Sequence, residues 1–172
     1  MENRKTYVMT TIAHVLDAMS AKLGMSGIEL NADGQVEIDF GNGFVAYITR
    51  IDSNALELSF PLPNLDFATH GMMAAMLAAN FLGQATGSGR LALDPVKLEA
   101  IYCERWDIAE MSPGMVDRRT EEFVRAGAYW FSQGTDTLVE AARSIGDNDE
   151  RVAAQPAVSG RDEAGFGGMI RL

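Results

Sequence analysis

Polar and apolar side chains alternate strictly over residues 35–40, and a glycine-rich turn follows at once. Val36 and Ile38 occupy every second position of this stretch, a period that is typical of a strand with one buried face. The turn Gly41-Asn42-Gly43 accepts the positive φ that a tight reversal requires. The chain is therefore expected to fold back as an antiparallel hairpin of 35–40 and 44–51, which constrains it to a sheet made of hairpins.

The other strands and the helices follow from the same kind of periodicity. A third strand is predicted over 55–62, and a second hairpin joins 90–94 to 97–106. Apolar residues recur at spacings of three and four in three further segments, which predicts helices. These helices are 6–23, ending at Gly24; 64–83, capped by Asn64 or Asp66; and a stretch from Ser112-Pro113 to 134, or as far as 145.

The resulting element order is α-β-β-β-α-β-β-α. Because the strands come in hairpins and not singly between helices, the fold class is α+β, with an antiparallel sheet of about five strands and three helices packed on it. Residues 1–145 are expected to form this domain. Residues 146–172 are polar, small and rich in glycine, which predicts a flexible C-terminal tail. Phe166 and Ile170 leave open that the tail docks on the chain itself or on a partner.

Composition excludes several classes of function. The chain has 172 residues, 47% of them hydrophobic, and a formal net charge of −10, which argues against binding to nucleic acid or to anionic membranes. No apolar run approaches the roughly 20 residues that cross a bilayer, so no membrane insertion is expected. His14 and Asp17 interrupt the apolar stretch that a signal peptide would need. We expect the protein to stay in the reducing compartment where it is made.

The sequence offers few groups for catalysis, metal binding or cofactor binding. Two loose dinucleotide patterns, at 41–46 and 87–92, lead into predicted strands and lack the helix N-terminus that holds a pyrophosphate. One cysteine and two histidines give no metal-ligand spacing. No catalytic residue, metal ligand or cofactor is therefore assigned, although Cys103 with His14 or His70 leaves a small cysteine enzyme open as an alternative.

Ten methionines are present, and three of them lie close together among alanines in the predicted helix 64–83. Methionine fills irregular cores and also suits surfaces that accept partners of varied shape, so both interpretations stay open. The alanines leave a low surface on which a second helix can pack closely. We predict a homodimer whose interface includes Met72, Ala75, Met76, Ala79, Tyr102 and Trp106.

Several short motifs stand at the ends of the predicted elements. They are, in order, Leu23-Gly24, the glycine turn, Pro61-Leu62-Pro63, Asn80-Phe81-Leu82-Gly83, Thr86-Gly87 and Leu91-Ala92-Leu93-Asp94-Pro95. In this order and spacing they resemble the class I type III secretion chaperones, the Tir chaperone (CesT-like) family, over about residues 5–133. The resemblance implies a small acidic α+β homodimer in the bacterial cytoplasm, without catalytic activity.

The resemblance also implies partners. Such chaperones bind the N-terminal segment of a secreted effector, keep it extended, and help present it to the secretion apparatus, whose ATPase is a candidate partner. A cargo strand is expected to add to a free sheet edge while its apolar side chains enter grooves beside the first helix. The residues hypothesised to line these grooves, or alternatively to form ordinary core, are Ile12, Leu16, Met19, Val36, Ile38, Phe44 and Ile48.

A second function remains open at this stage. The same architecture would suit a regulatory or adaptor domain that binds a folded protein and has no role in secretion. An isolated unfolded cargo peptide separates the two functions, because an adaptor for folded proteins should not bind it.

Overall fold

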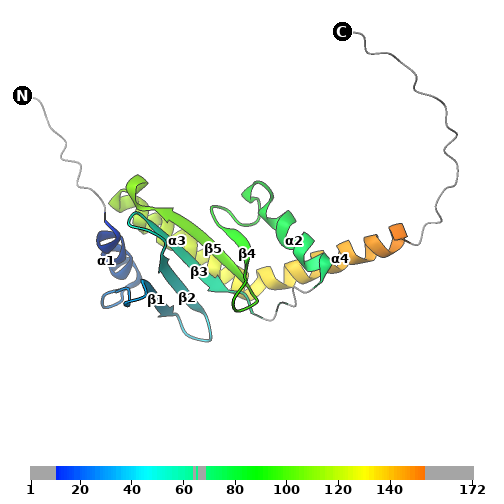
Figure 1. Ribbon diagram of the computed structural model, residues 1–172, viewed down its shortest axis with the longest axis horizontal. Coiled ribbons are helices and arrows are strands. Elements are labelled where there is room, and N and C mark those ends of the chain that lie inside the picture. Colours follow the sequence, from blue (N-terminus) through cyan, green and yellow to red (C-terminus); the bar gives the residue numbers. More distant parts are fainter. Residues whose placement is uncertain (1–10, 64, 66–68, 154–172) are drawn as a thin grey trace, which may run out of the picture.

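Both predicted hairpins form, and with one more strand they make a five-stranded antiparallel sheet (Figure 1). The computed structural model describes residues 11–63, 65 and 69–153. The strands are β1 (Gln35–Asp39), β2 (Val45–Arg50), β3 (Ala55–Pro61), β4 (Arg90–Asp94) and β5 (Glu99–Asp107). Their order across the sheet is β1-β2-β3-β5-β4, so β1 and β4 are the edge strands.

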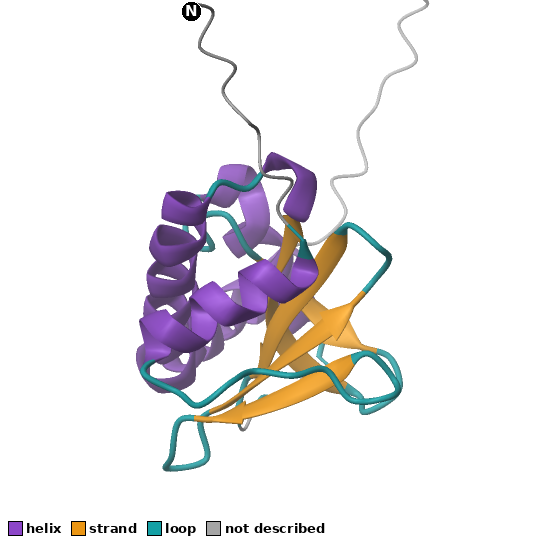
Figure 2. Cartoon of the chain, turned by 90° about the vertical axis from the view of Figure 1, so that its left-hand side faces the viewer, coloured by secondary structure: helices purple, strands orange, loops and turns teal. Residues whose placement is uncertain are grey.

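Helices cover one face of the sheet, and the described residues place none on the opposite face (Figure 2). The α-helices are α1 (Ile12–Leu23), α2 (His70–Asn80), α3 (Pro113–Tyr129) and α4 (Thr135–Ala153). Short helical turns are η1 (Phe81–Gly83), η2 (Ile108–Glu110) and η3 (Trp130–Gly134). α3 passes through the π-helical turn η3 directly into α4. The third predicted helix is therefore present, and it is longer than expected.

Local capping sets the ends of the first two helices. The Thr11 hydroxyl accepts a hydrogen bond from a main-chain N–H of the first turn of α1, and Gly24 ends that helix at φ 68°. α2 is capped in the same way by Thr69. The caps predicted for this helix, Asn64 and Asp66, lie outside the described residues. The predicted end of α1 is thus confirmed, whereas the cap of α2 is a residue that the sequence analysis did not select.

The segment that follows Gly146 differs from the prediction. α4 ends at Ala153, so 146–153, expected to begin a flexible tail, are helical, while 154–172 lie outside the described residues. α4 lies along α2 (Figure 1). At Gly71 the two backbones are so close that a Cβ would lie 2.5 Å from the carbonyl oxygen of Ala142. Packing on α2 therefore supports a helix where local composition favours a tail.

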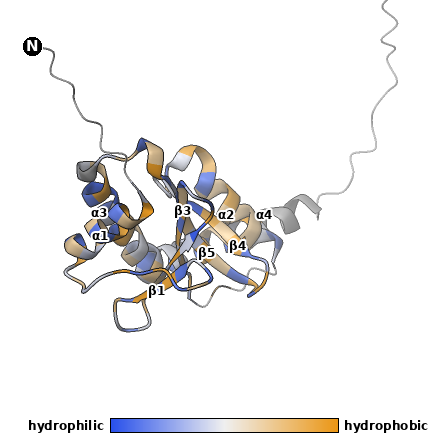
Figure 3. Cartoon of the chain, turned by 60° about the vertical axis from the view of Figure 1, so that its left-hand side comes forward, coloured by the Kyte–Doolittle hydropathy of each residue, from blue (hydrophilic) through white to orange (hydrophobic). Residues whose placement is uncertain are grey.

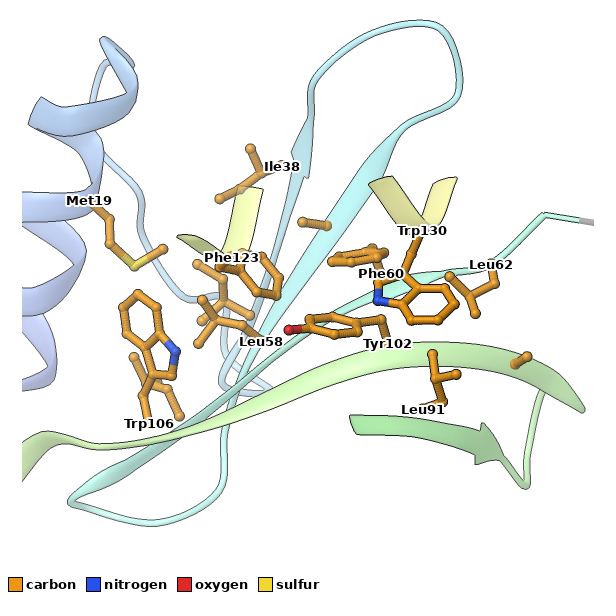
Figure 4. Packing of buried hydrophobic residues seen from close by; sticks show 14 of the residues in the cluster. Met19, Ile38, Leu58, Phe60, Leu62, Leu91, Tyr102, Trp106, Phe123 and Trp130 are labelled. Atoms are coloured by element: carbon orange, nitrogen blue, oxygen red, sulfur yellow. The ribbon is translucent and has the colours of Figure 1, made fainter. Parts of the chain in front are cut away.

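The core lies between the helices and the covered face of the sheet (Figure 4). The ring of Phe60 in β3 lies 5.0 Å from that of Tyr102 in β5 and 5.3 Å from that of Phe123 in α3, measured between centroids. Leu58, two residues before Phe60, is fully buried. The alternation of β3 thus directs apolar side chains to the covered face and polar ones, such as Glu57, to the open face.

Candidate functional site

The first candidate site is a groove of about 450 Å³, termed the α1 groove, between α1 and the segment that leads into β1. Its lining residues are Ile12, Ala13, Leu16, Asp17, Ile28, Glu29, Leu30 and Arg50. Ile12 and Leu16 are four residues apart, so they share one face of α1. Ile28 and Leu30 alternate with the exposed Glu29 and present their side chains to the same space. The groove is therefore apolar inside, with charged groups around it.

A buried serine holds the two walls of the α1 groove together. Ser20 is 5% exposed. Its hydroxyl donates to the carbonyl oxygen of Leu16 at 2.8 Å and accepts from the N–H of Ile28 at 2.7 Å. Both hydrogen-bonding roles of this hydroxyl are filled, which fixes the segment after α1 against the helix. The groove is thus a preformed feature of the fold.

The outer edge of β1 begins next to Asn31, which follows the groove residue Leu30. The Asn31 N–H donates to the Gln35 carbonyl oxygen at 2.8 Å, and the Asn31 Oδ1 accepts from the Gln35 N–H at 3.0 Å. Beyond Gln35, this edge has unpaired main-chain groups. The Phe40 N–H donates to the Phe44 carbonyl oxygen at 2.9 Å. Because hydrogen-bonded pairs alternate in antiparallel strands, the even-numbered residues of β1 bond to β2. The N–H and C=O groups of Glu37 and Asp39 then point away from the sheet, where none of residues 11–63, 65 and 69–153 pairs with them. Such an edge can accept another strand.

The opposite edge of the sheet is closed at one position by a side chain. Asn80, the last residue of α2, donates its amide to the Leu91 carbonyl oxygen at 2.9 Å and accepts from the Leu91 N–H at 2.8 Å. The carboxamide therefore takes the place that a neighbouring strand would occupy on β4. An asparagine suits the end of α2 because its side chain has both the donor and the acceptor that the main chain of Leu91 needs.

The residues predicted to bind cargo divide between the groove and the core. Ile12 and Leu16 line the α1 groove, although Leu16 is only 5% exposed, and Val36 and Phe44 are half-buried. The other three lie in the core, at most 3% exposed: Met19, Ile38 and Ile48. A fully buried side chain has no surface to offer a partner, so these three support the site from within. Contact with a bound chain stays a prediction for the first four.

The residues predicted for the dimer interface lie inside the protomer. Five of them are at most 8% exposed, and Ala79 is half-buried: Met72, Ala75, Met76, Tyr102 and Trp106. α4 packs against α2, and Tyr102 and Trp106 point into the core from β5 (Figure 4). These side chains are therefore not available on the surface of this fold. The homodimer itself stays a prediction.

A different apolar surface, termed the α2–β4 strip, is exposed on the same part of the fold. It consists of Met73, Leu77, Phe81, Leu82, Leu93, Val96 and Leu98, which are between 46% and 88% exposed. These residues belong to α2, η1, β4 and the turn after β4, and α2 contacts β4. α2 is apolar along most of its length (Figure 3). Large apolar side chains exposed on elements that contact each other favour an interaction surface.

The chemistry of Cys103 argues against a cysteine nucleophile. The side chain is fully buried, and burial, followed by the charge of Glu57, raises the pKa of the thiol to about 12. The nucleophilic thiolate is thus disfavoured at neutral pH. Within the described part of the chain, no group of three His, Cys, Asp or Glu side chains could hold a metal ion. No described helix combines the length and apolar character that crossing a membrane requires.

Comparison with known protein families shows to which family this chain belongs. The sequence model of the Tir chaperone protein (CesT) family matches residues 14–130. The chain belongs to this family. The matched CesT region runs from α1 through the sheet and α2 to the end of α3, so α4 lies beyond it. Among curated proteins, no significant match is found.

Solved structures share the CesT-like fold. A chain of the ExsC-ExsE complex superposes with a TM-score of 0.58 at 10% identity, covering 71% of this chain and 92% of the other. A chain of the HopA1-SchA chaperone-effector complex gives 0.53 at 19% identity, covering 67% and 89%. A chain of the complex between the Yersinia pestis type III secretion chaperone SycH and a stable fragment of YscM2 gives 0.53 at 18% identity, covering 69% and 98%. At these identities the likeness shows the fold.

The sequence analysis missed residues of two surfaces of this chain, the α1 groove and the α2–β4 strip. Ile28 and Leu30 complete the α1 groove, and their alternation with Glu29 is a signal that could have been read. Met73 and Leu77 form the exposed face of α2. Their spacing of four was visible, but the sequence does not say which face of an apolar helix is covered by the rest of the chain.

Proposed function

We propose that this CesT-family protein is a type III secretion chaperone. It binds the N-terminal segment of a secreted effector, keeps that segment extended, and helps deliver it to the secretion apparatus. It acts without catalysis, as a homodimer in the bacterial cytoplasm. Family membership supports this function, as does the fold shared with chains of a chaperone-effector complex and of a type III secretion chaperone complex. The observation that carries the proposal is the free edge of β1 beside the α1 groove.

The physical basis of binding is strand addition combined with a side-chain pocket. An extended cargo segment pairs its main chain with the outward groups of Glu37 and Asp39, which any sequence can do. Apolar cargo side chains then enter the α1 groove between Leu16 and Leu30. Main-chain pairing explains tolerance of varied cargo sequence, and the groove selects segments with an apolar residue near the paired strand. A folded partner whose strands are all paired has no extended segment to add to β1.

The proposal is tested first by capture from the native host. The tagged protein is purified from that host, bound chains are identified by mass spectrometry, and the mass of the complex is measured by multi-angle light scattering. We expect one larger protein, bound through its N-terminal segment. Capture of folded proteins only, with no affinity for isolated unfolded segments, would contradict the chaperone function and favour the adaptor.

Two substitutions then test the site with a peptide from the captured protein. Glu37→Pro removes the outward N–H and is tolerated on an edge strand, and Leu30→Glu places a charge in the α1 groove. Each is expected to weaken peptide binding roughly tenfold or more, because Glu37→Pro loses a strand hydrogen bond and Leu30→Glu replaces part of the apolar groove wall with a charged group that an apolar side chain would desolvate. Glu37→Ala and Ile51→Glu are the matched controls, since the first keeps the N–H and the second charges an exposed apolar residue outside the groove.

The homodimer is proposed to use the α2–β4 strip and not the buried residues predicted from the sequence. Leu77 is 72% exposed and Phe81 is 66% exposed, so burial of both against a second copy would remove a large apolar area from water. We expect Leu77→Arg to convert the dimer to a monomer in sedimentation, while far-UV circular dichroism is unchanged. A full dimer in this variant would remove the α2–β4 strip as the interface.

A further inference from the structure

The free part of the β1 edge, termed the β1 slot, is short because hydrogen bonds close it at both ends. The outward main-chain groups of Gln35 are bonded to Asn31, at 2.8 and 3.0 Å. At the other end, the Gly41 N–H donates to the Asp39 carboxylate at 2.7 Å. The outward N–H and C=O groups of Glu37 and Asp39 are left without a partner among the described residues. An added strand can therefore pair along about five residues.

A strand added to the β1 slot has its side chains on the two faces of the sheet in alternation. Residues opposite Glu37 and Asp39 share the open face with these carboxylates, because directly opposed residues point to the same face. The residue between them is opposite Ile38 and points to the covered face, on which the helices lie (Figure 2). Ile38 is buried and Val36 is half-buried. The covered face thus offers apolar neighbours, and the open face offers charged ones.

The two carboxylates on the open face have no cationic neighbour on β2. Glu37 is opposite Tyr47, and Asp39 is opposite Val45. Both carboxylates are exposed, and neither forms an ion pair with another described residue. Lys97, in the turn after β4, reaches this face, but its Nζ lies over the Tyr47 ring, 4.6 Å from the centroid. The open-face side of the β1 slot is therefore negative and lacks a paired cation.

The α1 groove, which lies on the covered side, differs in character. Leu16 and Leu30 contribute apolar walls, while Asp17, Glu29 and Arg50 bring charges of both signs to its lining. A basic side chain that entered this groove would lose water against the apolar walls and would also meet the Arg50 guanidinium, and both effects oppose binding. Selection for positive charge is therefore confined to the open face, and the groove favours apolar side chains.

We propose that the β1 slot selects extended protein segments in which basic side chains alternate with apolar ones. Lysine or arginine side chains opposite Glu37 and Asp39 pair with the two carboxylates, and the apolar residue between them lies next to Ile38. The same carboxylates oppose pairing of β1 with β1 of a second copy, because like charges would then face each other. That cargo supplies the segment rests on the proposed function. The inference adds side-chain selectivity to main-chain pairing that any sequence can make.

Three synthetic seven-residue peptides test the β1 slot without any cargo. In each peptide valine alternates with one variable residue, which is lysine, glutamine or glutamate. Amide hydrogen exchange followed by NMR reports pairing, because the outward N–H groups of Glu37 and Asp39 gain a partner, whereas the Ile38 N–H already faces β2.

The lysine peptide is expected to slow exchange at Glu37 and Asp39 and leave Ile38 unchanged. It should bind about fivefold tighter than the glutamine peptide, and the glutamate peptide should bind most weakly. This preference should shrink in about 0.5 M salt, because the charges are exposed. Equal affinities of the three peptides would refute the charge selection and would leave the carboxylates as protection against self-pairing.

Double variants locate the selection. Glu37→Gln with Asp39→Asn removes both charges and keeps a side-chain oxygen for the Gly41 N–H, so the lysine and glutamine peptides should then bind equally. Asp136→Asn with Glu140→Gln removes the same charge from exposed positions of α4 and should keep the preference, which separates local pairing from the net charge of the chain. Glu37→Lys with Asp39→Asn should make the glutamate peptide bind tighter than the lysine peptide. An unchanged order in this variant would overturn the proposal.

The results also separate this inference from the chaperone function. If the lysine peptide is preferred and the captured cargo loses affinity when its basic residues in the paired segment are replaced, both stand. If cargo is captured but the three peptides bind equally, or protect no amide of β1, the charge selection fails alone. If the lysine peptide is preferred and no unfolded segment is captured, the chemistry of the β1 slot stands and its use by cargo is refuted.

Discussion

Glu104 is buried in the core, where it joins Tyr102, Trp106 and Arg119 in one hydrogen-bond network. Substitutions of Glu104 can measure how much its charge and its hydrogen bonds each contribute to the free energy of unfolding. The carboxylate is 1% exposed and lies on β5 between Tyr102 and Trp106, whose polar atoms face each other along the strand (Figure 4). It accepts from both residues and from Arg119. Arg119 also lies over the Trp106 ring, 5.1 Å from its centroid.

The magnitudes follow from what each variant leaves unpaired. Glu104→Leu leaves the Trp106 N–H without its acceptor and the Arg119 guanidinium with only the Arg105 carbonyl oxygen, 3.4 Å away. Loss of the buried carboxylate should cost about 3–5 kcal/mol. In Glu104→Gln, the amide N–H can donate to the Tyr102 oxygen while Tyr102 donates to the Thr86 carbonyl oxygen, and the amide oxygen still accepts from Trp106. All the neutral hydrogen bonds are then kept, and the loss should be about 1–2 kcal/mol.

The measurement is urea unfolding followed by tryptophan fluorescence, with the free energy of unfolding taken by linear extrapolation. For a chain of this size, Glu104→Leu should also lower the melting temperature by roughly 6–20 °C. Glu122→Gln, an exposed carboxylate on α3, is the control and should change stability by less than about 0.5 kcal/mol. A loss below about 1 kcal/mol for Glu104→Leu, or equal losses for Leu and Gln, would refute the reasoning.

Three further outcomes are expected. Gly71→Ala should destabilise the protein by about 1–3 kcal/mol in urea unfolding, because its Cβ would meet the α4 backbone, whereas Gly114→Ala in α3, with open space around it, should be neutral or slightly stabilising. Lys22 of α1 and, to a smaller extent, Arg125 of α3 lower the pKa of Glu121. The wild-type protein should therefore be more stable than Lys22→Met above about pH 4.5, the ordinary pKa of a glutamate, and this difference should vanish as the pH falls through the lowered pKa of Glu121. A difference in the free energy of unfolding that persists in acid would contradict the ion pair between Lys22 and Glu121. Cys103 should react with iodoacetamide at pH 8 only after urea is added, as mass spectrometry would show; labelling of the folded chain would disprove its burial.

The hairpins and the end of α1 were predictable because they depend on neighbouring residues. The alternation around Val36 and Ile38, the turn before Phe44 and the glycine after α1 each restrict local φ and ψ, whatever the rest of the chain does. The motif that contains Asn80 was recognised by resemblance, but its physical role was not. Only the structure shows its carboxamide on the edge of β4.

Part of the candidate site was also predictable from local spacing along the chain. Ile12 and Leu16 were placed on one face of α1 by their spacing, and that face does line a groove. Met19 has the same periodicity but is only 2% exposed. A sequence pattern tells which side chains share a face, and it does not tell where the covering layer ends. The same limit explains why the core residues Ile38 and Ile48 were assigned to the cargo surface.

The sequence by itself determined the spacing of apolar residues in each helix and strand, the order of these elements, the α+β class and the family. The tertiary structure decided which apolar faces are covered. Met76 and Leu77 are adjacent in α2, yet one is 8% exposed and the other 72%. α4, a segment more than fifty residues away and partly predicted to be a tail, packs on α2. Periodicity is a local property of the backbone, whereas burial depends on which distant surfaces meet.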